Sequence, residues 1–318
     1  MPLSADTQIL ETATGLVNAL RSAQPPGTSK SFRPAHAKGH LLTSTFTPSP
    51  TASTLSSAPH FNLPSTPLTI RFSSSTGLPA IQDTDPNSNP RGIALRFHIP
   101  SAEDGKRRHT DIIAHSTPFF PVRSGEDFLA LLQALGAGGD AVPKFLGEHP
   151  ETKRFLDAPK PSPESFATAR YWGVNAFVFT NEEGKETTVR YQIVPVAGEH
   201  SLSPSQLSDK SENYLFEELA PRLSKSPIVF KLQAQIAQEG DVTDDATVLW
   251  PEEREVVELG EVRIEKVKGD EESLSEQKKV IFDPVPRVKG VRASADPLVE
   301  MRANIYLVSG RERREAEA

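Results

Sequence analysis

The sequence contains no cysteine, and it has only two methionines and two tryptophans among its 318 residues. Without cysteine the chain can form no disulfide, and zinc, iron–sulfur or other metal centres with thiolate ligands are excluded. Thiolate ligation of a haem iron is excluded for the same reason.

Long apolar runs are also absent, and the longest are far shorter than the about 20 residues that a membrane-spanning helix needs. The opening MPLSADTQILE lacks the basic-then-apolar pattern of a secretion signal, and the final REAEA matches no common peroxisomal tripeptide. The formal net charge is −7 with acids and bases interspersed, which leaves no basic field for nucleic acid. We therefore expect a cytoplasmic protein that binds neither a membrane nor a nucleic acid.

Short segments in which apolar and polar residues alternate dominate the middle of the chain. LTIRF (68–72) and IALRF (93–97) have this pattern, which predicts strands. A hairpin is predicted over 173–195, and IVFKLQAQI (228–236) predicts a further strand.

Helical periodicity occurs towards the ends of the chain and in the inserts. It predicts helices over 6–22, over 128–135 with Ser124 as N-cap, and over 209–223. The stretch from Thr43 to Pro67 is rich in Ser, Thr and Pro, and we expect it to be a surface loop. Strands in the middle and helices outside them indicate the α+β class with an antiparallel sheet.

The last predicted helix carries a stripe of Arg and Tyr residues. Asp296 and Pro297 supply an N-cap and a first-turn proline. At about 100° per residue, steps of four and eleven residues return to within about 40° and 20° of the starting direction, so Arg302, Tyr306 and Arg313 share one face. A phenol binds ferric iron only as phenolate, a charge that a cation one turn away favours. A solvated surface stripe would look the same, so these residues alone leave both interpretations open.

Seven segments, in a fixed order, resemble one known family. They are RPAHAKG (33–39), LTIRFSSSTG (68–77), NPRGIALRFHIP (89–100), STPFFPVRSGEDF (116–128), YWGVNAFVF (171–179), DATVLW (245–250) and the segment from FDPVPRVKG to RERR (282–314). By these segments the chain resembles the catalase family in its short, catalase-related peroxidase (minimal catalase) form.

The resemblance implies a catalase-like fold, an eight-stranded antiparallel β-barrel with surrounding helices and a haem pocket. It also implies a single haem domain over residues 1–318. Within it, 1–26 would form an N-terminal helical arm, and 297–318 the proximal tyrosine helix and tail.

The resemblance also assigns roles to particular residues of this chain. His36 matches the distal histidine that moves the peroxide proton, and Ser73 the serine that orients its ring. Tyr306 matches the axial ligand of the iron of haem b, with Arg302 beside it. The groups that would contact the haem itself match one aromatic residue on its distal face and three arginines at its propionates, namely Phe128, Arg33, Arg71 and Arg313.

One departure from the family pattern concerns the distal pocket. Large catalases have an Asn-Asn pair before Thr-Pro, whereas this chain has His115 and Ser116 before Thr117 and Pro118. The missing asparagine puts fast disproportionation of peroxide in doubt and leaves peroxidase turnover in place. His115 is a candidate second distal catalytic group, although its side chain could equally point away from the pocket.

The implied function is a haem peroxidase that reduces hydrogen peroxide or small organic hydroperoxides through a ferryl intermediate, with weak catalase activity as a side reaction. Its partners would be the peroxide and a small-molecule electron donor, and the oligomeric state, a homodimer included, stays open. The alternative is a catalase-fold enzyme that rearranges or oxidatively tailors an organic substrate. Ala35 stands where allene oxide synthases of this fold carry a threonine, which argues against that one chemistry.

Overall fold

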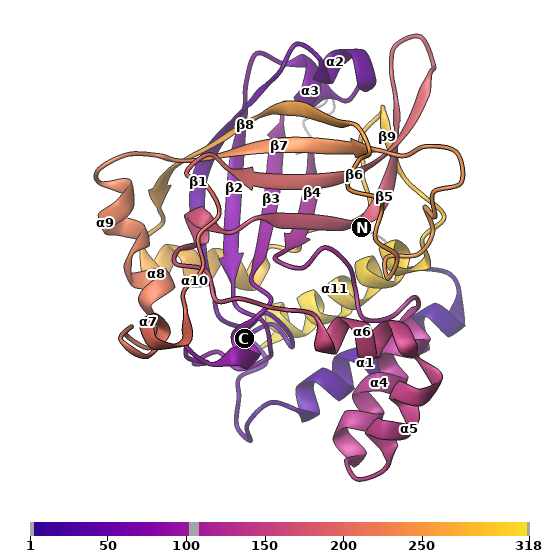
Figure 1. The fold of residues 1–318 in the computed structure, drawn as a ribbon, viewed down its shortest axis with the longest axis vertical. Coiled ribbons are helices and arrows are strands. Elements are labelled where there is room, and N and C mark those ends of the chain that lie inside the picture. Colours follow the sequence, from indigo (N-terminus) through magenta and orange to yellow (C-terminus); the bar gives the residue numbers. More distant parts are fainter. Residues whose placement is uncertain (1–2, 102–107, 317–318) are drawn as a thin grey trace.

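Nine strands form one antiparallel sheet, and eight of them close into a barrel in the computed structural model, which describes residues 3–101 and 108–316 (Figure 1). The strands are β1 (Gly39–Pro48), β2 (Thr66–Ser73), β3 (Gly92–Ile99), β4 (Arg108–His115), β5 (Tyr171–Thr180), β6 (Glu186–Pro195), β7 (Ile228–Ile236), β8 (Val256–Val267) and β9 (Val291–Ala293). Their order is β4-β3-β2-β1-β8-β7-β6-β5-β9, and the barrel closes where β4 pairs with β5 through His115 and Trp172. The predicted α+β class and eight-stranded antiparallel barrel are confirmed.

Helices lie mainly at one end of the barrel (Figure 1). They are α1 (Thr7–Ser22), α2 (Ala52–Leu55), α3 (Pro59–Asn62), α4 (Gly125–Ala137), α5 (Ala141–Glu148), α6 (Pro150–Asp157), α7 (Pro204–Ser208), α8 (Tyr214–Glu217), α9 (Leu219–Leu223), α10 (Asp270–Lys279) and α11 (Pro297–Glu315). Among the residues described, no helix has both the length and the apolar character that crossing a membrane would require.

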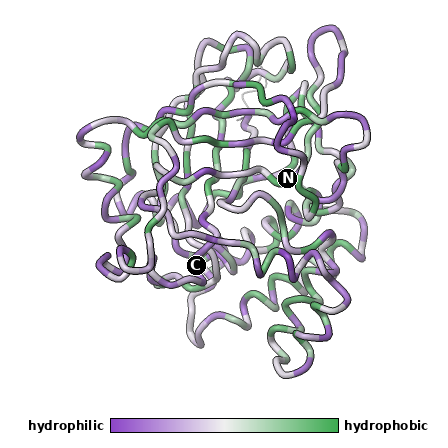
Figure 2. The backbone as a smooth tube through the Cα atoms, viewed as in Figure 1, coloured by the Kyte–Doolittle hydropathy of each residue, from purple (hydrophilic) through white to green (hydrophobic). Residues whose placement is uncertain are grey.

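Aromatic side chains fill the inside of the barrel. Phe72 stacks on Phe166 with ring centroids 4.8 Å apart, and Phe46 meets the edge of Phe97 at 5.3 Å. Figure 2 shows hydrophobic residues concentrated in the barrel strands and hydrophilic residues in the outer loops. Burying each large apolar side chain stabilises the fold by roughly 1.5–3 kcal/mol. This core therefore makes the barrel a stable base for the helices and loops at its end.

Three helices, α1, α4 and α11, pack against one another through an apolar cluster that includes Leu16, Val17, Met301 and Ile305. A Cβ added to Gly125 would lie 2.5 Å from the Met301 side chain, so a larger residue would force Met301 to move where α4 starts against α11. The helix predicted over 6–22 is therefore confirmed as α1, and it is packed into the molecule. The helix predicted after Ser124 is confirmed as α4, with the Ser124 hydroxyl accepting from the Asp127 amide at 3.1 Å.

The surface loop expected from Thr43 to Pro67 is wrong. Strand β1 runs through Pro48, α2 and α3 follow, and Phe46 and Phe61 are fully buried in the barrel core. The hydroxyl-rich composition wrongly indicated a loop because hydroxyls of this segment form hydrogen bonds with the main chain inside the fold. For example, Ser56 Oγ donates to the Gly290 carbonyl at 2.7 Å. Sparse aromatic residues therefore determine the structure of this segment.

The single helix predicted over 209–223 is also wrong, since the structure has two short helices, α8 and α9, in this range, and α7 ends before it. Pro221 explains the break before α9. It has no amide hydrogen to continue a helix from α8, and it is tolerated only in the first turn of a new one. Glu218 supplies that new start as the N-cap of α9.

Candidate active site

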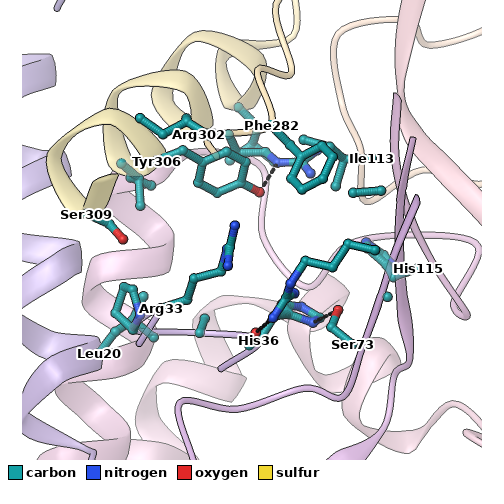
Figure 3. A pocket seen from close by; sticks show the side chains of 18 of the residues that line it. Leu20, Arg33, His36, Ser73, Ile113, His115, Phe282, Arg302, Tyr306 and Ser309 are labelled. Atoms are coloured by element: carbon teal, nitrogen blue, oxygen red, sulfur yellow. Dashed lines mark hydrogen bonds between the residues drawn. The ribbon is translucent and has the colours of Figure 1, made fainter. Parts of the chain in front are cut away.

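A cavity lies where the end of the barrel meets α11, α1 and α4 (Figure 3). All nine predicted site residues line this cavity, although they come from segments that lie far apart in the sequence. They are Arg33, His36, Arg71, Ser73, His115, Phe128, Arg302, Tyr306 and Arg313. The structure thus brings together every residue that the resemblance selected, while their chemical roles stay predictions.

His36 lies in the loop before β1, in a left-handed backbone conformation with φ of 52° that non-glycine residues adopt at a cost. Its Nδ1 lies 3.2 Å from the Ser73 hydroxyl, and Arg71 Nη2 donates to its main-chain carbonyl at 2.8 Å. A Cβ on Gly92 would lie 2.6 Å from Ser73 Oγ and 3.1 Å from His36 Nδ1. Glycine at 92 is therefore what leaves room for this pair, a requirement that the sequence alone did not reveal.

The electrostatics of the cavity keep the His36 ring neutral. Burial first, and then the positive charges of Arg71 and Arg302, lower the pKa of His36 to about 4. At neutral pH the ring therefore has one protonated nitrogen and one free lone pair, the state that a group needs in order to accept and return a proton.

His115, the last residue of β4, also lines the cavity, so its side chain does not point away. Its Nδ1 lies 2.8 Å from the Thr117 hydroxyl. Burial first, and then Arg302 and His36, lower the pKa of His115 to about 3. A second neutral imidazole is therefore placed beside the first.

Tyr306 lies on α11 across the cavity from His36, as Figure 3 shows. Arg302 Nε donates to its phenol oxygen at 3.1 Å, and Arg302 Nη1 donates to the side-chain oxygen of Asn175. The Asn175 amide donates at 2.7 Å to Asp296, the N-cap of α11. Burial raises the pKa of Asp296, and hydrogen bonds from Asn175 and Leu298 oppose this rise. The sequence had given Asp296 only a capping role and had not selected Asn175.

Three arginines occupy one edge of the cavity; Arg71 and Arg313 are buried and Arg33 is partly buried. No ion pair to any of the three is found in the part of the chain that the structure describes. Arg33 Nη2 and Arg313 Nη2 donate to the Val280 carbonyl at 3.0 and 3.1 Å, and Arg313 Nε has no partner. Burial and mutual repulsion lower the pKa of Arg33, and burial lowers that of Arg71 to about 9 and of Arg313 to about 10. Buried cations without a counter-charge indicate a ligand that carries more than one negative group.

Apolar side chains form the remaining walls. Phe128 meets the edge of Phe120 at a centroid distance of 5.6 Å, and Ile113, Phe282 and Leu20 are among the other apolar residues of the lining. None of the described residues that line the cavity is acidic. An apolar cavity with a phenol on one wall, an imidazole on the other and cations at the edge fits a planar metal complex with peripheral carboxylates. Among the described residues there is no group of three His, Cys, Asp or Glu side chains that could bind a metal ion without such a complex.

The eight-stranded barrel and the cavity at its end are those expected of a catalase-type protein, and comparison with known proteins agrees. Residues 31–317 match the catalase family, so the chain belongs to it. It is 33% identical over 293 residues to a catalase-related peroxidase of Mycolicibacterium paratuberculosis (strain ATCC BAA-968 / K-10), with 89% of each chain covered. It is 30% identical to a catalase-related peroxidase of Synechococcus elongatus (strain ATCC 33912 / PCC 7942 / FACHB-805), covering 89% of this chain and 84% of that one.

Longer catalases match over part of their length. Catalase-2 of Bacillus subtilis (strain 168) is 25% identical over 266 residues, which cover 76% of this chain and 37% of that protein. The crystal structure of a fungal catalase superposes with a TM-score of 0.76 at 19% identity, covering 89% of this chain and 59% of that one, and shows the same fold. The chain is therefore of the short, catalase-related form, and membership of the family implies a haem cofactor.

Proposed function

We propose that this protein is a haem b peroxidase that reduces hydrogen peroxide or small organic hydroperoxides at the expense of a small-molecule electron donor. The observation that carries the proposal is the pairing of Tyr306, held by Arg302, with a neutral His36 on the opposite wall of one cavity. Its relatives named catalase-related peroxidase match over nearly their whole length, which supports the same reading.

The residues for holding the cofactor are distributed over three parts of the cavity. Tyr306 would bind the iron through its phenolate oxygen, and the Arg302 guanidinium stabilises that negative charge. Arg33, Arg71 and Arg313 would pair with the two propionates, and Phe128 would pack on the ring face. When bound, haem supplies the redox equivalents for O–O cleavage and donor oxidation.

His36 is the proposed proton carrier. Its free ring nitrogen takes the proton from the first oxygen of the peroxide and returns it to the leaving oxygen, so that water, or an alcohol from an organic hydroperoxide, departs instead of an anion. Ser73 holds the other ring nitrogen and thereby fixes the direction of the ring. Because the ring stays neutral down to about pH 4, it is ready to accept this proton throughout the physiological range.

His115 occupies the place where the family pattern has an asparagine, and we propose that it is a second polar group in the distal pocket. Its Nδ1 is engaged with Thr117, so only one ring nitrogen is left for the substrate. An asparagine would offer both a donor and an acceptor to align a second peroxide. We therefore expect donor oxidation to outweigh oxygen release.

The chain from 1 to 318 is proposed to work as one haem domain, because Leu20 of α1 and several residues of α11 line the same cavity as the barrel. Rearrangement or oxidative tailoring of an organic substrate is not favoured, since the full-length relatives are named as peroxidases.

The test is to load the purified protein with haem and to measure oxygen release and aromatic-donor oxidation side by side after adding peroxide. We expect readily measurable donor oxidation and oxygen release that is weak compared with a large catalase under matched conditions. Oxygen release at catalase-like rates without donor oxidation would contradict the peroxidase assignment.

A further inference from the structure

Gln277 lies outside the cavity lining yet connects two of its arginines. It belongs to α10 and is buried, with 7% of its surface exposed. Its side-chain oxygen accepts from Arg71 Nε at 2.7 Å, and its main-chain carbonyl accepts from Arg313 Nη1 at 2.7 Å. One residue of α10 thus fixes the guanidinium groups of a β2 residue and an α11 residue.

The orientation of the Gln277 amide is determined by its neighbours. Gln277 Nε2 donates to Ser273 Oγ at 3.0 Å. Ser273 Oγ also accepts from the Leu41 main-chain amide at 3.1 Å. Leu41 is the cross-strand partner of Arg71 in the β1–β2 ladder. Since a guanidinium can only donate, the amide oxygen is the atom that faces Arg71, and the amide nitrogen is left to face Ser273.

The other end of the Arg71 guanidinium holds the main chain of His36. Arg71 Nη2 donates to the His36 carbonyl at 2.8 Å, at the residue whose φ is 52°. A Cβ on Gly39 would lie 2.4 Å from Arg71 Nη2, so glycine leaves the guanidinium the space for this contact. A strained backbone conformation persists only where surrounding contacts hold it, and the hydrogen bond from Arg71 is one of these contacts.

The amide of Gln277 has the further property of being neutral. A glutamate would fit the same space and accept the same hydrogen bond, but it would cancel one of the three uncompensated charges at the cavity edge. A neutral acceptor instead orients Arg71 and leaves its charge available to a carboxylate ligand.

We propose that Gln277 is a positioning residue that links the carboxylate-binding edge of the cavity to the distal histidine. Its neutral side chain orients Arg71, which holds the His36 backbone while it remains a cation for a propionate. This inference rests on the proposed function, because it assigns Arg71 to the cofactor and His36 to the peroxide.

Two variants separate the two parts of this role. Gln277→Met removes the acceptor and adds no charge, whereas Gln277→Glu keeps the acceptor and adds a charge. Gln238→Glu, at an exposed glutamine two residues after the end of β7, makes the same charge change as a matched control. Each protein is measured for affinity for iron-free protoporphyrin IX and its dimethyl ester, by quenching of tryptophan fluorescence, and for the peroxide reaction rate of the haem-loaded form.

The expected results for the two variants differ in kind. Gln277→Glu should weaken binding of protoporphyrin about tenfold or more and leave binding of the uncharged dimethyl ester within about threefold. Gln277→Met should change porphyrin affinity by less than about threefold but slow the peroxide reaction per bound haem about tenfold, more than Gln277→Glu does. The Gln238→Glu control should match wild-type protein in every measurement.

Equal effects of the two variants on both readings would overturn the inference, since a purely structural residue gives that pattern. Wild-type porphyrin affinity and peroxide reaction rate in both variants would also overturn the inference. The same holds if Gln277→Glu weakens binding of protoporphyrin and of its dimethyl ester equally. If wild-type protein binds haem and reacts with peroxide while the variants show one of these patterns, only the inference fails. Wild-type protein that binds no porphyrin would overturn the proposed function and the inference together.

Discussion

His60 provides a quantitative test of how burial in the barrel core changes the pKa of a titratable group and the pH dependence of stability. The residue lies in α3 with 2% of its surface exposed, its ring centroid 4.0 Å from that of Phe61 and 4.6 Å from that of Phe97. Its Nδ1 has no hydrogen-bond partner, and burial lowers the pKa of His60 from 6.5 to about 3. The folded protein therefore keeps this ring neutral at pH values where the unfolded chain protonates it.

The sign of the effect on stability follows directly. Above pH 6.5 both states are neutral at His60, and the group makes no pH-dependent contribution. As the pH falls below 6.5 the unfolded chain binds a proton that the folded protein does not, so stability falls until the pH reaches the folded pKa of about 3. At pH 5 the cost is about 2 kcal/mol for His60. His36 and His115 shift in the same direction, so the three together cost about 6 kcal/mol, which is comparable with the whole stability of an ordinary domain.

The perturbation is His60→Leu, and the assay is chemical denaturation of the cofactor-free protein at pH 7 and at pH 5. The loss of unfolding free energy between the two pH values should be about 2 kcal/mol smaller in the variant than in wild-type protein. Any packing cost of the substitution is present at both pH values and cancels in this difference. His200→Gln, at an exposed histidine, is the matched control and should keep the wild-type difference. If His60→Leu loses as much stability as wild-type protein between pH 7 and pH 5, the reasoning about the buried ring is refuted.

Two further predictions concern the distal wall. His36→Ala should bind haem with a near-normal ferric spectrum but react with peroxide about two to four decades more slowly, which is the contribution of a positioned general acid–base. Stopped-flow measurement of the peroxide reaction tests this. Loss of haem from the variant would instead show that His36 has a structural role. His115→Asn should raise the ratio of oxygen release to donor oxidation, because an amide presents both a donor and an acceptor to a second peroxide. An unchanged ratio would mean that His115 does not contact the substrate.

The sequence predicted the helix with Tyr306 well because its signals are local. Asp296 and Pro297 define the start, and helical periodicity then determines which side chains share the face of Arg302. His36 and Ser73 come from distant segments, and only the resemblance to a known family connected them before the structure did. Their 3.2 Å contact depends on the register between β1 and β2, which no local pattern specifies.

The residues that the sequence did not reveal act through long-range contacts. Asn175 reads as one polar position in a strand, and it bridges Arg302 and Asp296 only because β5 passes beside α11. Gln277 reads as an ordinary polar position in a charged helix, yet it is buried against the barrel. The loop wrongly expected around Phe46 failed for a related reason, since composition counts residues equally whereas burial is dominated by the few large apolar ones.

The central claim is that Tyr306 binds the haem iron, and the most direct measurement is the absorption and resonance Raman spectrum of the haem-loaded protein and of its Tyr306→Phe variant. Wild-type protein should show high-spin ferric haem with tyrosinate-to-iron charge-transfer features. These features and tight haem binding should both be lost in Tyr306→Phe. They should persist in the matched control Tyr214→Phe, because the Tyr214 hydroxyl donates to the Pro163 carbonyl and lies away from the cavity. An unchanged tyrosinate spectrum in Tyr306→Phe, or a wild-type spectrum without these features, would contradict the account.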